Sequence, residues 1–158
     1  MTPDMHPNQQ LITSFYEAFQ RKDIATMQNC YADDATFTDE VFRNLDAAQT
    51  RKMWEMLIRR GKDLSLTVED VQANDTTGSA TWVATYSFSQ TNRRVVNQVT
   101  ADFAFKNGKI SQHTDRFDFY TWSRQALGLP GLLLGWTGYL RRKVQQTALK
   151  SLTGYINK

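Results

Sequence analysis

The chain has 158 residues, of which 41% are hydrophobic and 12% aromatic, enough for one domain with a substantial core. Its longest apolar run, Leu132 to Leu134, is far shorter than the roughly 20 residues that cross a bilayer. Residues 1–7 lack the basic segment and apolar stretch of a typical secretion signal. We therefore expect a cytoplasmic protein that does not span a membrane.

The net charge of +3 conceals an asymmetry between the two parts of the chain. No Asp or Glu follows Asp118, whereas six Arg and Lys residues do, so the C-terminal segment carries +6 and residues 1–118 carry −3. The single cysteine, Cys30, cannot form an internal disulfide, and no Cys/His cluster indicates a zinc site. Six positive charges without a recognisable binding module also predict no specific nucleic-acid partner.

Helical periodicity comes first in the chain. Leu11, Phe15 and Phe19 recur at four-residue spacing, which predicts an amphipathic helix over residues 8–21. Asp23 has the side chain of an N-cap and predicts a short second helix that runs through residue 30. Two helices therefore precede the first strand.

A strand is predicted around residues 35–42, followed by a third helix. Asp46 is the expected N-cap of that helix, and Gly61 stands where a left-handed C-cap is expected. We interpret Asp33 and Asp34, like Asp118, as groups that stabilise turns or cap helices.

Alternation of apolar and polar residues replaces the helical period from Leu64 onward. It predicts four strands up to Phe119, the last beginning at Lys109, and Asn107-Gly108 suits the tight hairpin turn that comes before it. Strands joined by such short turns are antiparallel. Three helices followed by this sheet predict an α+β domain in which a bent sheet wraps around helices.

The chain after residue 120 has a different character. Gly128 to Gly131 breaks the pattern, and apolar residues then recur at three- and four-residue spacing from Leu133 to Tyr155. We expect a main domain over residues 1–120, and a basic amphipathic helical extension over 121–158 that packs on the domain or on a partner.

Asp39 is the first candidate functional residue. It shares a face with Phe37 if the strand alternates, so its carboxylate would point inward, at a cost of several kcal/mol unless it is paired, protonated or used. One interpretation is a general base with a pKa raised by an apolar pocket. The other is a rim residue that accepts backbone hydrogen bonds or pairs with Arg43.

The last strand carries a second candidate pair. His113 and Asp115 fall on one face with Phe117, about 7 Å apart along the strand, where they could relay protons near neutral pH. The alternative is a core histidine satisfied by one hydrogen bond. A metal held by His113, Asp115 and Asp39 is disfavoured, because nothing in the spacing selects it.

Three motifs in a fixed order carry a resemblance to a known family. They are the helix start at residues 22–24, the Tyr31 to Thr36 segment, and Asn107 to Ile110 leading into residues 113–118. Over residues 8–120 the chain resembles the nuclear transport factor 2-like (NTF2-like) superfamily, in its SnoaL-like branch of polyketide cyclase-like and ketosteroid isomerase-like proteins. The resemblance implies a cone-shaped fold with a strongly curved, mainly antiparallel sheet around three helices, a pocket open at one end, and a homodimer.

Asp39 falls where ketosteroid isomerases, by this resemblance, keep their general base. The isomerase pattern fails elsewhere: Phe15 stands at the position of the oxyanion-binding tyrosine, with Tyr16 one residue off that face. Ala101 stands at the position of the protonated aspartate, and Asp102 has the opposite parity. Each missing donor typically costs on the order of a hundredfold in rate. Classical steroid isomerisation is therefore disfavoured.

We expect the pocket to bind a small apolar molecule. One hypothesis is an isomerase, cyclase or hydrolase without cofactor or metal, in which Asp39, as general base, acts with His113 and Asp115. The alternatives are a non-catalytic ligand-binding or dimerisation module, and a membrane-surface or protein-docking role for residues 132–158, which we weigh below internal or dimer packing. The residues expected to line the pocket are mainly aromatic: Phe15, Tyr16, Phe19, Phe37, Trp54, Trp82, Tyr86, Ala101, Phe103 and Phe117.

Overall fold

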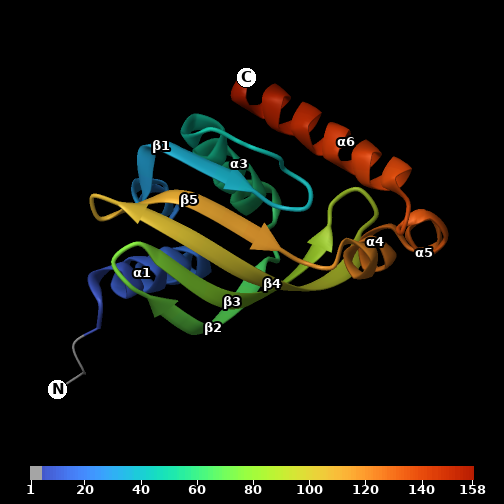
Figure 1. Ribbon diagram of the computed structural model, residues 1–158. Coiled ribbons are helices and arrows are strands. Elements are labelled where there is room, and N and C mark those ends of the chain that lie inside the picture. Colours follow the sequence, from blue (N-terminus) through green and yellow to red (C-terminus); the bar gives the residue numbers. More distant parts are fainter. Residues whose placement is uncertain (1–4) are drawn as a thin grey trace.

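The computed structural model describes residues 5–158, and residues 1–4 of the N-terminal segment lie outside the described residues. Helices and strands follow the predicted order, with three helices after the last strand (Figure 1). The elements are α1 (Pro7–Arg21), α2 (Ile24–Asn29), β1 (Tyr31–Thr38), α3 (Ala47–Arg60), β2 (Ser65–Ala73), β3 (Thr77–Phe88), β4 (Arg93–Lys106), β5 (Lys109–Arg116), α4 (Phe119–Leu127), α5 (Leu129–Leu134) and α6 (Gly138–Ile156).

The five strands form one sheet in the order β1-β5-β4-β3-β2. β1 pairs with β5 in parallel, and the other neighbours are antiparallel. The register shifts between Glu69 and Gln72, where Asp70 has a φ of 56°, and again between Ala104 and Phe105. Such irregularities bend and twist strands. The predicted α+β fold, a curved and mainly antiparallel sheet around three helices with a C-terminal helix added, is confirmed.

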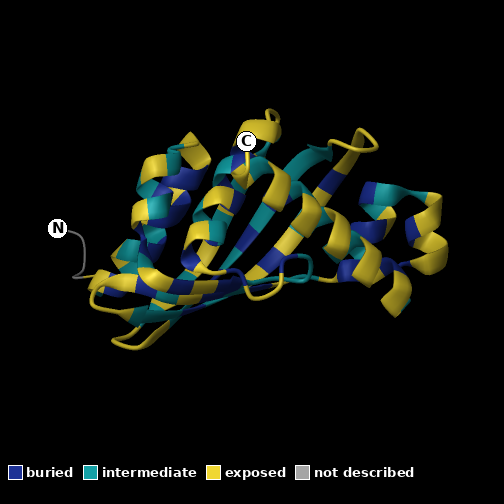
Figure 2. Cartoon of the chain, turned by 90° about the horizontal axis from the view of Figure 1, so that it is seen from above, coloured by how far each residue is buried: buried dark blue, intermediate teal, exposed yellow. Residues whose placement is uncertain are grey.

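The core lies between the sheet and the helices that cover one face of it. α1 packs on β2 and β3, α3 packs on β1, and α6 runs back over α3. Buried positions recur along one side of each helix and alternate along the strands (Figure 2). This agrees with the periods of 3.6 and 2 in the sequence.

Local sequence signals were accurate at most of the predicted turns and caps. The side chains of Asp23 and Asp46 accept backbone hydrogen bonds at the starts of α2 and α3. Asn107 and Gly108 both have positive φ, as a tight hairpin requires. The left-handed cap at Gly61 is wrong: its φ is −89°, and its N–H bonds to the carbonyl of Leu57.

The predicted bounds of the first strand are wrong. β1 begins at Tyr31, which pairs with Ile110, so Asp33 and Asp34 are exposed strand residues and not turn groups. The strand ends at Thr38, and Asp39 starts a turn because its carboxylate accepts the N–H groups of the residues two and three further on. The expected strand alternation at Asp39 therefore does not occur.

β5 also ends earlier than predicted, at Arg116. Asp118 caps α4 by accepting from the N–H of Thr121, as expected of a capping group. Gly128, with a φ of 71°, then separates α4 from α5. Among the described residues, no helix combines the length and apolar character that crossing a membrane requires.

The C-terminal helices form a second, smaller cluster at one end of the sheet. Phe119, Trp122 and Ala126 of α4 are buried with Val95 of β4. The side-chain amide of Gln125 donates to the carbonyl of Val96 at 3.1 Å and accepts from its N–H at 2.7 Å, so α4 satisfies backbone groups of β4 beyond its pairing with β5. The helices thereby cover the end of the cone that lies next to Asp39.

Candidate acid/base site

Asp39 lies at the end of β1, in a turn that its own side chain stabilises. Its Oδ1 accepts from the N–H groups of Val41 at 2.7 Å and Phe42 at 2.6 Å, and its N–H donates to the carbonyl of Phe42. Arg43 donates to its backbone carbonyl at 2.7 Å. The backbone hydrogen bonds of the rim interpretation are therefore present.

The surroundings of Asp39 nevertheless raise the pKa of its carboxyl group. Although the residue is partly exposed, desolvation raises the pKa of Asp39 to about 7, against the lowering effect of the bond from Phe42. The negative charge of Asp115 adds to the rise in this pKa. A carboxyl group with a pKa near neutrality can accept and release protons under physiological conditions.

A chain of buried hydrogen bonds runs from Trp54 to Asp115. Trp54 Nε1 donates to Tyr31 Oη at 2.8 Å, Tyr31 Oη lies 2.8 Å from His113 Nδ1, and His113 Nε2 lies 2.8 Å from Asp115 Oδ1. All four residues are at most 3% exposed. His113 and Asp115 thus lie on the inner face of β5, as their shared parity predicts.

The roles within this chain follow from what each group can donate. An ionised Asp115 only accepts, so His113 Nε2 carries the proton, and in a neutral imidazole Nδ1 then accepts from the hydroxyl of Tyr31. Burial raises the pKa of Tyr31, and the charge of Asp115 raises it further, so this hydroxyl stays protonated. This series of hydrogen bonds holds the carboxylate of Asp115 in place, and the negative charge of Asp115 acts on Asp39.

Tyr16 is fully buried, because α1 turns both Phe15 and Tyr16 toward the sheet. The expectation that it lies one residue off the face of Phe15 is wrong, and its role as a pocket-lining residue stays a prediction. Burial raises the pKa of Tyr16, and Asp115 raises it further. Its hydroxyl and Nε1 of Trp82 are the buried side-chain donors of residues 5–158 that lack a hydrogen-bond partner, and the two rings lie 6.0 Å apart.

The remaining residues expected to line a pocket pack closely together. The centroid of His113 lies 4.9 Å from that of Phe37 and 4.4 Å from that of Phe103, and Phe15 lies 5.8 Å from Trp54. Their role as pocket-lining residues stays a prediction. The residues placed in this main core are Phe15, Tyr16, Phe19, Phe37, Trp54, Trp82, Ala101 and Phe103, with Tyr86 and Phe117 partly buried against it.

Three partly buried apolar residues connect the two clusters of the molecule. Val41, Tyr86 and Phe117 contact both the main core and the cluster under α4. Tyr86 Oη accepts from Trp122 Nε1 at 2.8 Å, and burial raises the pKa of Tyr86, with a further contribution from the charge of Asp39. Asp39 therefore lies near the apolar side chains that join the sheet to the C-terminal helices.

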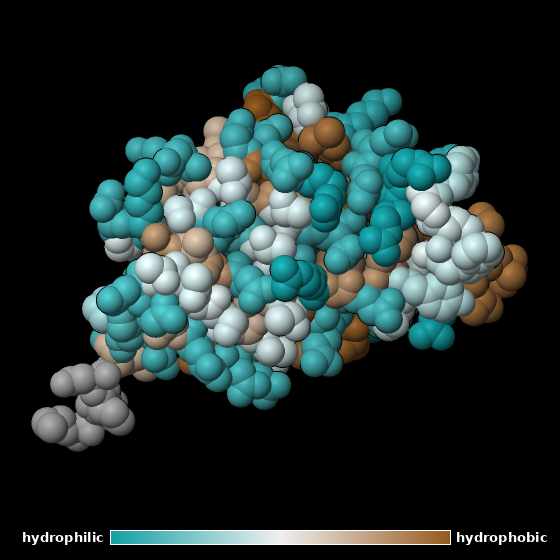
Figure 3. All heavy atoms as spheres, in the orientation of Figure 1, coloured by the Kyte–Doolittle hydropathy of each residue, from teal (hydrophilic) through white to brown (hydrophobic). Residues whose placement is uncertain are grey.

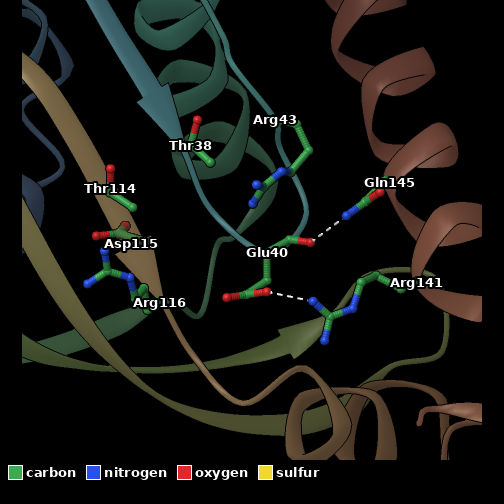
Figure 4. A pocket seen from close by; sticks show the side chains of 8 residues that line it. All are labelled: Thr38, Glu40, Arg43, Thr114, Asp115, Arg116, Arg141 and Gln145. Atoms are coloured by element: carbon green, nitrogen blue, oxygen red, sulfur yellow. Dashed lines mark hydrogen bonds and ion pairs between the residues drawn. The ribbon is translucent and has the colours of Figure 1, made fainter. Parts of the chain in front are cut away.

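A polar hollow of about 500 Å³ opens next to this site and reaches Asp115 (Figure 4). Glu40 connects the turn after β1 to α6 across this hollow. Its carboxylate accepts from Arg141 at 2.9 Å, and its backbone carbonyl accepts from the side chain of Gln145 at 3.1 Å. The residues that line it are Thr38, Glu40, Arg43, Thr114, Asp115, Arg116, Arg141 and Gln145.

Sequence reasoning missed most of this hollow. Thr38, Thr114 and Arg116 have the outward parity of their strands, and α6 joins them only through the tertiary fold. Tyr31 was noted only as part of a motif, and no local pattern places it beside His113, which lies 82 positions away in the chain. Among residues 5–158, no group of three or more His, Cys, Asp or Glu side chains is arranged to hold a metal ion.

Solved structures with a similar fold come from several organisms. An NTF2-like protein of unknown function from Burkholderia pseudomallei is 16% identical, covers 78% of this chain and 99% of its own, and has a TM-score of 0.68. A proposed polyketide cyclase from Streptomyces antibioticus is 20% identical over 76% and 98%, with a TM-score of 0.64. An LEH-like epoxide hydrolase from M. tuberculosis is 19% identical over 87% and 98%, with a TM-score of 0.62.

These likenesses define the class of the fold, which is the NTF2-like cone. The model of the SnoaL-like domain family matches residues 12–113, and the chain belongs to that family. No curated protein matches the chain.

Proposed function

We propose that this chain is a cofactor-independent enzyme that moves a proton on a small, largely apolar molecule bearing a carbonyl group, with Asp39 as general base. The observation that carries the proposal is the carboxyl of Asp39, whose pKa is raised to about 7 by desolvation and by the adjacent charge of Asp115. An aspartate that only caps a turn accepts backbone hydrogen bonds, and these lower the pKa of its carboxyl group. At Asp39 desolvation outweighs that lowering, and the pKa rises.

The proposed chemistry begins at a carbon next to the carbonyl. The ionised carboxylate of Asp39 takes the proton from that carbon, and the electron pair of the broken C–H bond moves onto the carbonyl oxygen as an enolate. In a substrate with a C=C bond next to that carbon, the enolate extends into a dienolate. Asp39 then returns the proton to the far carbon of the former C=C bond, which shifts the double bond and gives isomerisation. In a cyclase, the enolate carbon instead attacks a second carbonyl, whose oxygen takes the proton from Asp39.

The proposal assigns the enolate oxygen to two unpaired donors in the core. The hydroxyl of Tyr16 and Nε1 of Trp82 are buried without partners, and a ligand oxygen between them would satisfy both. The pKa of Tyr16 is raised well above its ordinary value, which keeps this hydroxyl protonated as a donor. In the proposal, these two groups take the place of the donors that are missing at Phe15 and Ala101.

The surroundings of Asp39 support a ligand that is apolar with a few polar groups. Val41, Tyr86 and Phe117 offer apolar contacts between the two clusters, and the hollow at Asp115 offers an approach from solvent. The fold neighbours described as an epoxide hydrolase and a proposed polyketide cyclase support small-molecule chemistry on this fold. The homodimer and the cytoplasmic location remain predictions.

The test measures proton exchange at carbon. In D2O, the wild-type protein should accelerate exchange of the α-protons of 2-tetralone, followed by NMR, with a rate that rises with pH and levels off above about 7. Asp39→Asn should lower the rate on the order of a hundredfold or more, because the amide keeps the turn but cannot accept the proton. Tyr16→Phe should lower it by about a hundredfold.

Asp118→Asn is the matched control, since it makes the same chemical change at a helix cap outside the site. Exchange that is unaffected by Asp39→Asn, or a rate without a step near pH 7, would contradict the proposal. Binding of 2-naphthol, a flat enol analogue, without any acceleration of exchange would instead favour the non-catalytic binding module.

A further inference from the structure

One end of the molecule exposes a group of large apolar side chains that no element of the described chain covers. We call it the α5 face, and it is the hydrophobic area at the end formed by α5 in Figure 3. Trp136 is 76% exposed and Leu129 65%. The α5 face consists of Leu129, Leu132, Leu133, Leu134, Trp136 and Tyr139.

Basic residues surround this face. Lys143 Nζ lies 5.9 Å from the centroid of the Tyr139 ring, and the Arg142 guanidinium lies so close to Gly138 that a Cβ there would meet it at 2.9 Å. No acidic residue follows Asp118 in the chain, so no carboxylate from this segment neutralises these charges. The combination of exposed Leu, Trp and Tyr with adjacent Lys and Arg is typical of surfaces that bind at a membrane interface.

A hollow of about 300 Å³ lies at the edge of the α5 face, between two arginines and two leucines. Arg93 is held there by its Nε, which donates to the carbonyl of Gln125 at 2.8 Å, and Arg124 lies over the ring of Tyr120. Neither guanidinium has a carboxylate of residues 5–158 within 4.0 Å. Such paired guanidinium groups suit a phosphate, and Leu129 and Leu132 suit the acyl chains next to it.

We propose that the α5 face binds the surface of a membrane rich in anionic phospholipid, with a lipid phosphate held between Arg93 and Arg124. Charge favours this partner over a second copy of the chain, because two α5 faces brought together would oppose Arg124, Arg142 and Lys143 to like charges. The proposal does not depend on the acid/base site, because the two share no residue.

The test is sedimentation of the full chain with vesicles. The protein should bind vesicles of phosphatidylcholine with about 30% phosphatidylglycerol at least tenfold more tightly than pure phosphatidylcholine, and high salt should weaken the binding. The double variant Arg124→Gln/Arg142→Gln should bind about 25-fold more weakly, at roughly fivefold for each charge near the surface. Leu133→Ser/Trp136→Ala should lose at least tenfold.

Two controls make the result specific. Lys106→Gln/Lys109→Gln removes the same charge at the β4–β5 hairpin, at the opposite end of the molecule, and should change binding less than twofold. Leu149→Ser removes an exposed leucine further along α6 and should also have little effect.

The proposal would be overturned by absent binding to anionic vesicles, by equal binding to neutral ones, or by equal losses in the hairpin control. Self-association that Trp136→Ala abolishes, without vesicle binding, would assign the α5 face to a second copy. Circular dichroism of each variant checks that its fold is retained.

Discussion

Tyr16 and Tyr31 are both buried, and the charge of Asp115 raises the pKa of both. Their hydroxyl groups differ in hydrogen bonding. Tyr31 Oη lies between Trp54 Nε1 and His113 Nδ1, whereas Tyr16 Oη has no partner among residues 5–158. A satisfied buried hydroxyl stabilises the fold, and an unpaired one costs free energy. The same side chain therefore has a structural role at one position and is available to a ligand at the other.

We predict opposite effects for the two Tyr→Phe substitutions on the free energy of unfolding. Tyr31→Phe should lower it by about 2 to 4 kcal/mol, because it leaves Trp54 and His113 without their partner. Tyr16→Phe should leave it unchanged or raise it by up to about 1 kcal/mol, because an unsatisfied hydroxyl is removed. Urea denaturation of the two matched variants measures both effects, and an equal loss in both would contradict the assignment.

A second prediction concerns the pH dependence of stability. The pKa of Asp39 is raised to about 7 in the folded protein, so the folded state holds this proton more tightly than the unfolded state does. Its contribution to stability is therefore full below pH 4 and is lost as the pH rises toward 7, by at most about 4 kcal/mol.

Asp39→Asn should remove this fall while keeping the turn, because the amide oxygen can accept the same two N–H groups. Denaturant titrations from pH 4 to pH 8 compare the variant with the wild type. A wild-type stability that does not decline relative to Asp39→Asn over this range would refute a raised pKa at Asp39.

At the scale of elements, α6 is attached at a few buried points along an otherwise exposed helix. Leu140 and Leu152 are buried, and Glu55 accepts a hydrogen bond from Tyr155 Oη at 2.8 Å. The attachment of α6 to α3 thus brings Arg141 and Gln145 over Glu40 and completes the hollow beside Asp115. The helix that supplies part of this wall comes from outside residues 12–113, the part that the family model matches.

Leu152 should therefore be critical for this attachment. Leu152→Ala should lower the free energy of unfolding by about 2 to 4 kcal/mol, because the side chain is completely buried. Leu149→Ala, on the same helix but 45% exposed, should change it by less than about 0.5 kcal/mol. Thermal or urea unfolding distinguishes the pair, and similar values for both would mean that α6 does not pack as described.

At the scale of the whole molecule, the helices cover one face of the sheet and leave the outer face of the central strands open. Thr81, Val83 and Thr85 of β3 alternate with the buried residues Trp82 and Ala84, so they lie on the outer face of the sheet. β-branched sheet surfaces of this kind pack well against a second sheet. The acid/base site and the α5 face both lie away from this surface.

We predict a homodimer formed through this outer face. Sedimentation equilibrium should give a mass of about twice the 18.2 kDa of the chain. Val83→Arg should give the monomer mass, whereas Trp136→Ala should leave the dimer intact and so separate this contact from the α5 face. A monomer at micromolar concentration would show the homodimer prediction to be wrong.

Local patterns in the sequence were sufficient for the architecture. The caps at Asp23, Asp46 and Asp118 and the turn at Asn107-Gly108 depend on residues within a few positions of one another. The alternation that placed His113 and Asp115 on one face is equally local. Backbone hydrogen bonding and side-chain periodicity act over such short distances, so the sequence alone determined the order of elements from α1 to β5 and the antiparallel pairing of β2 to β5, but not the parallel pairing of β1 with β5.

Only the tertiary structure decided how the site is assembled. The bond between Tyr31 and His113 joins residues 82 positions apart, and the bond between Arg141 and Glu40 joins residues 101 apart. Whether Tyr16 faces inward, and whether Asp39 ends a strand or continues it, depends on strand register and on which helix packs opposite. These choices are set by burial across the whole core, because the free energy of desolvation depends on neighbours that are distant in the chain.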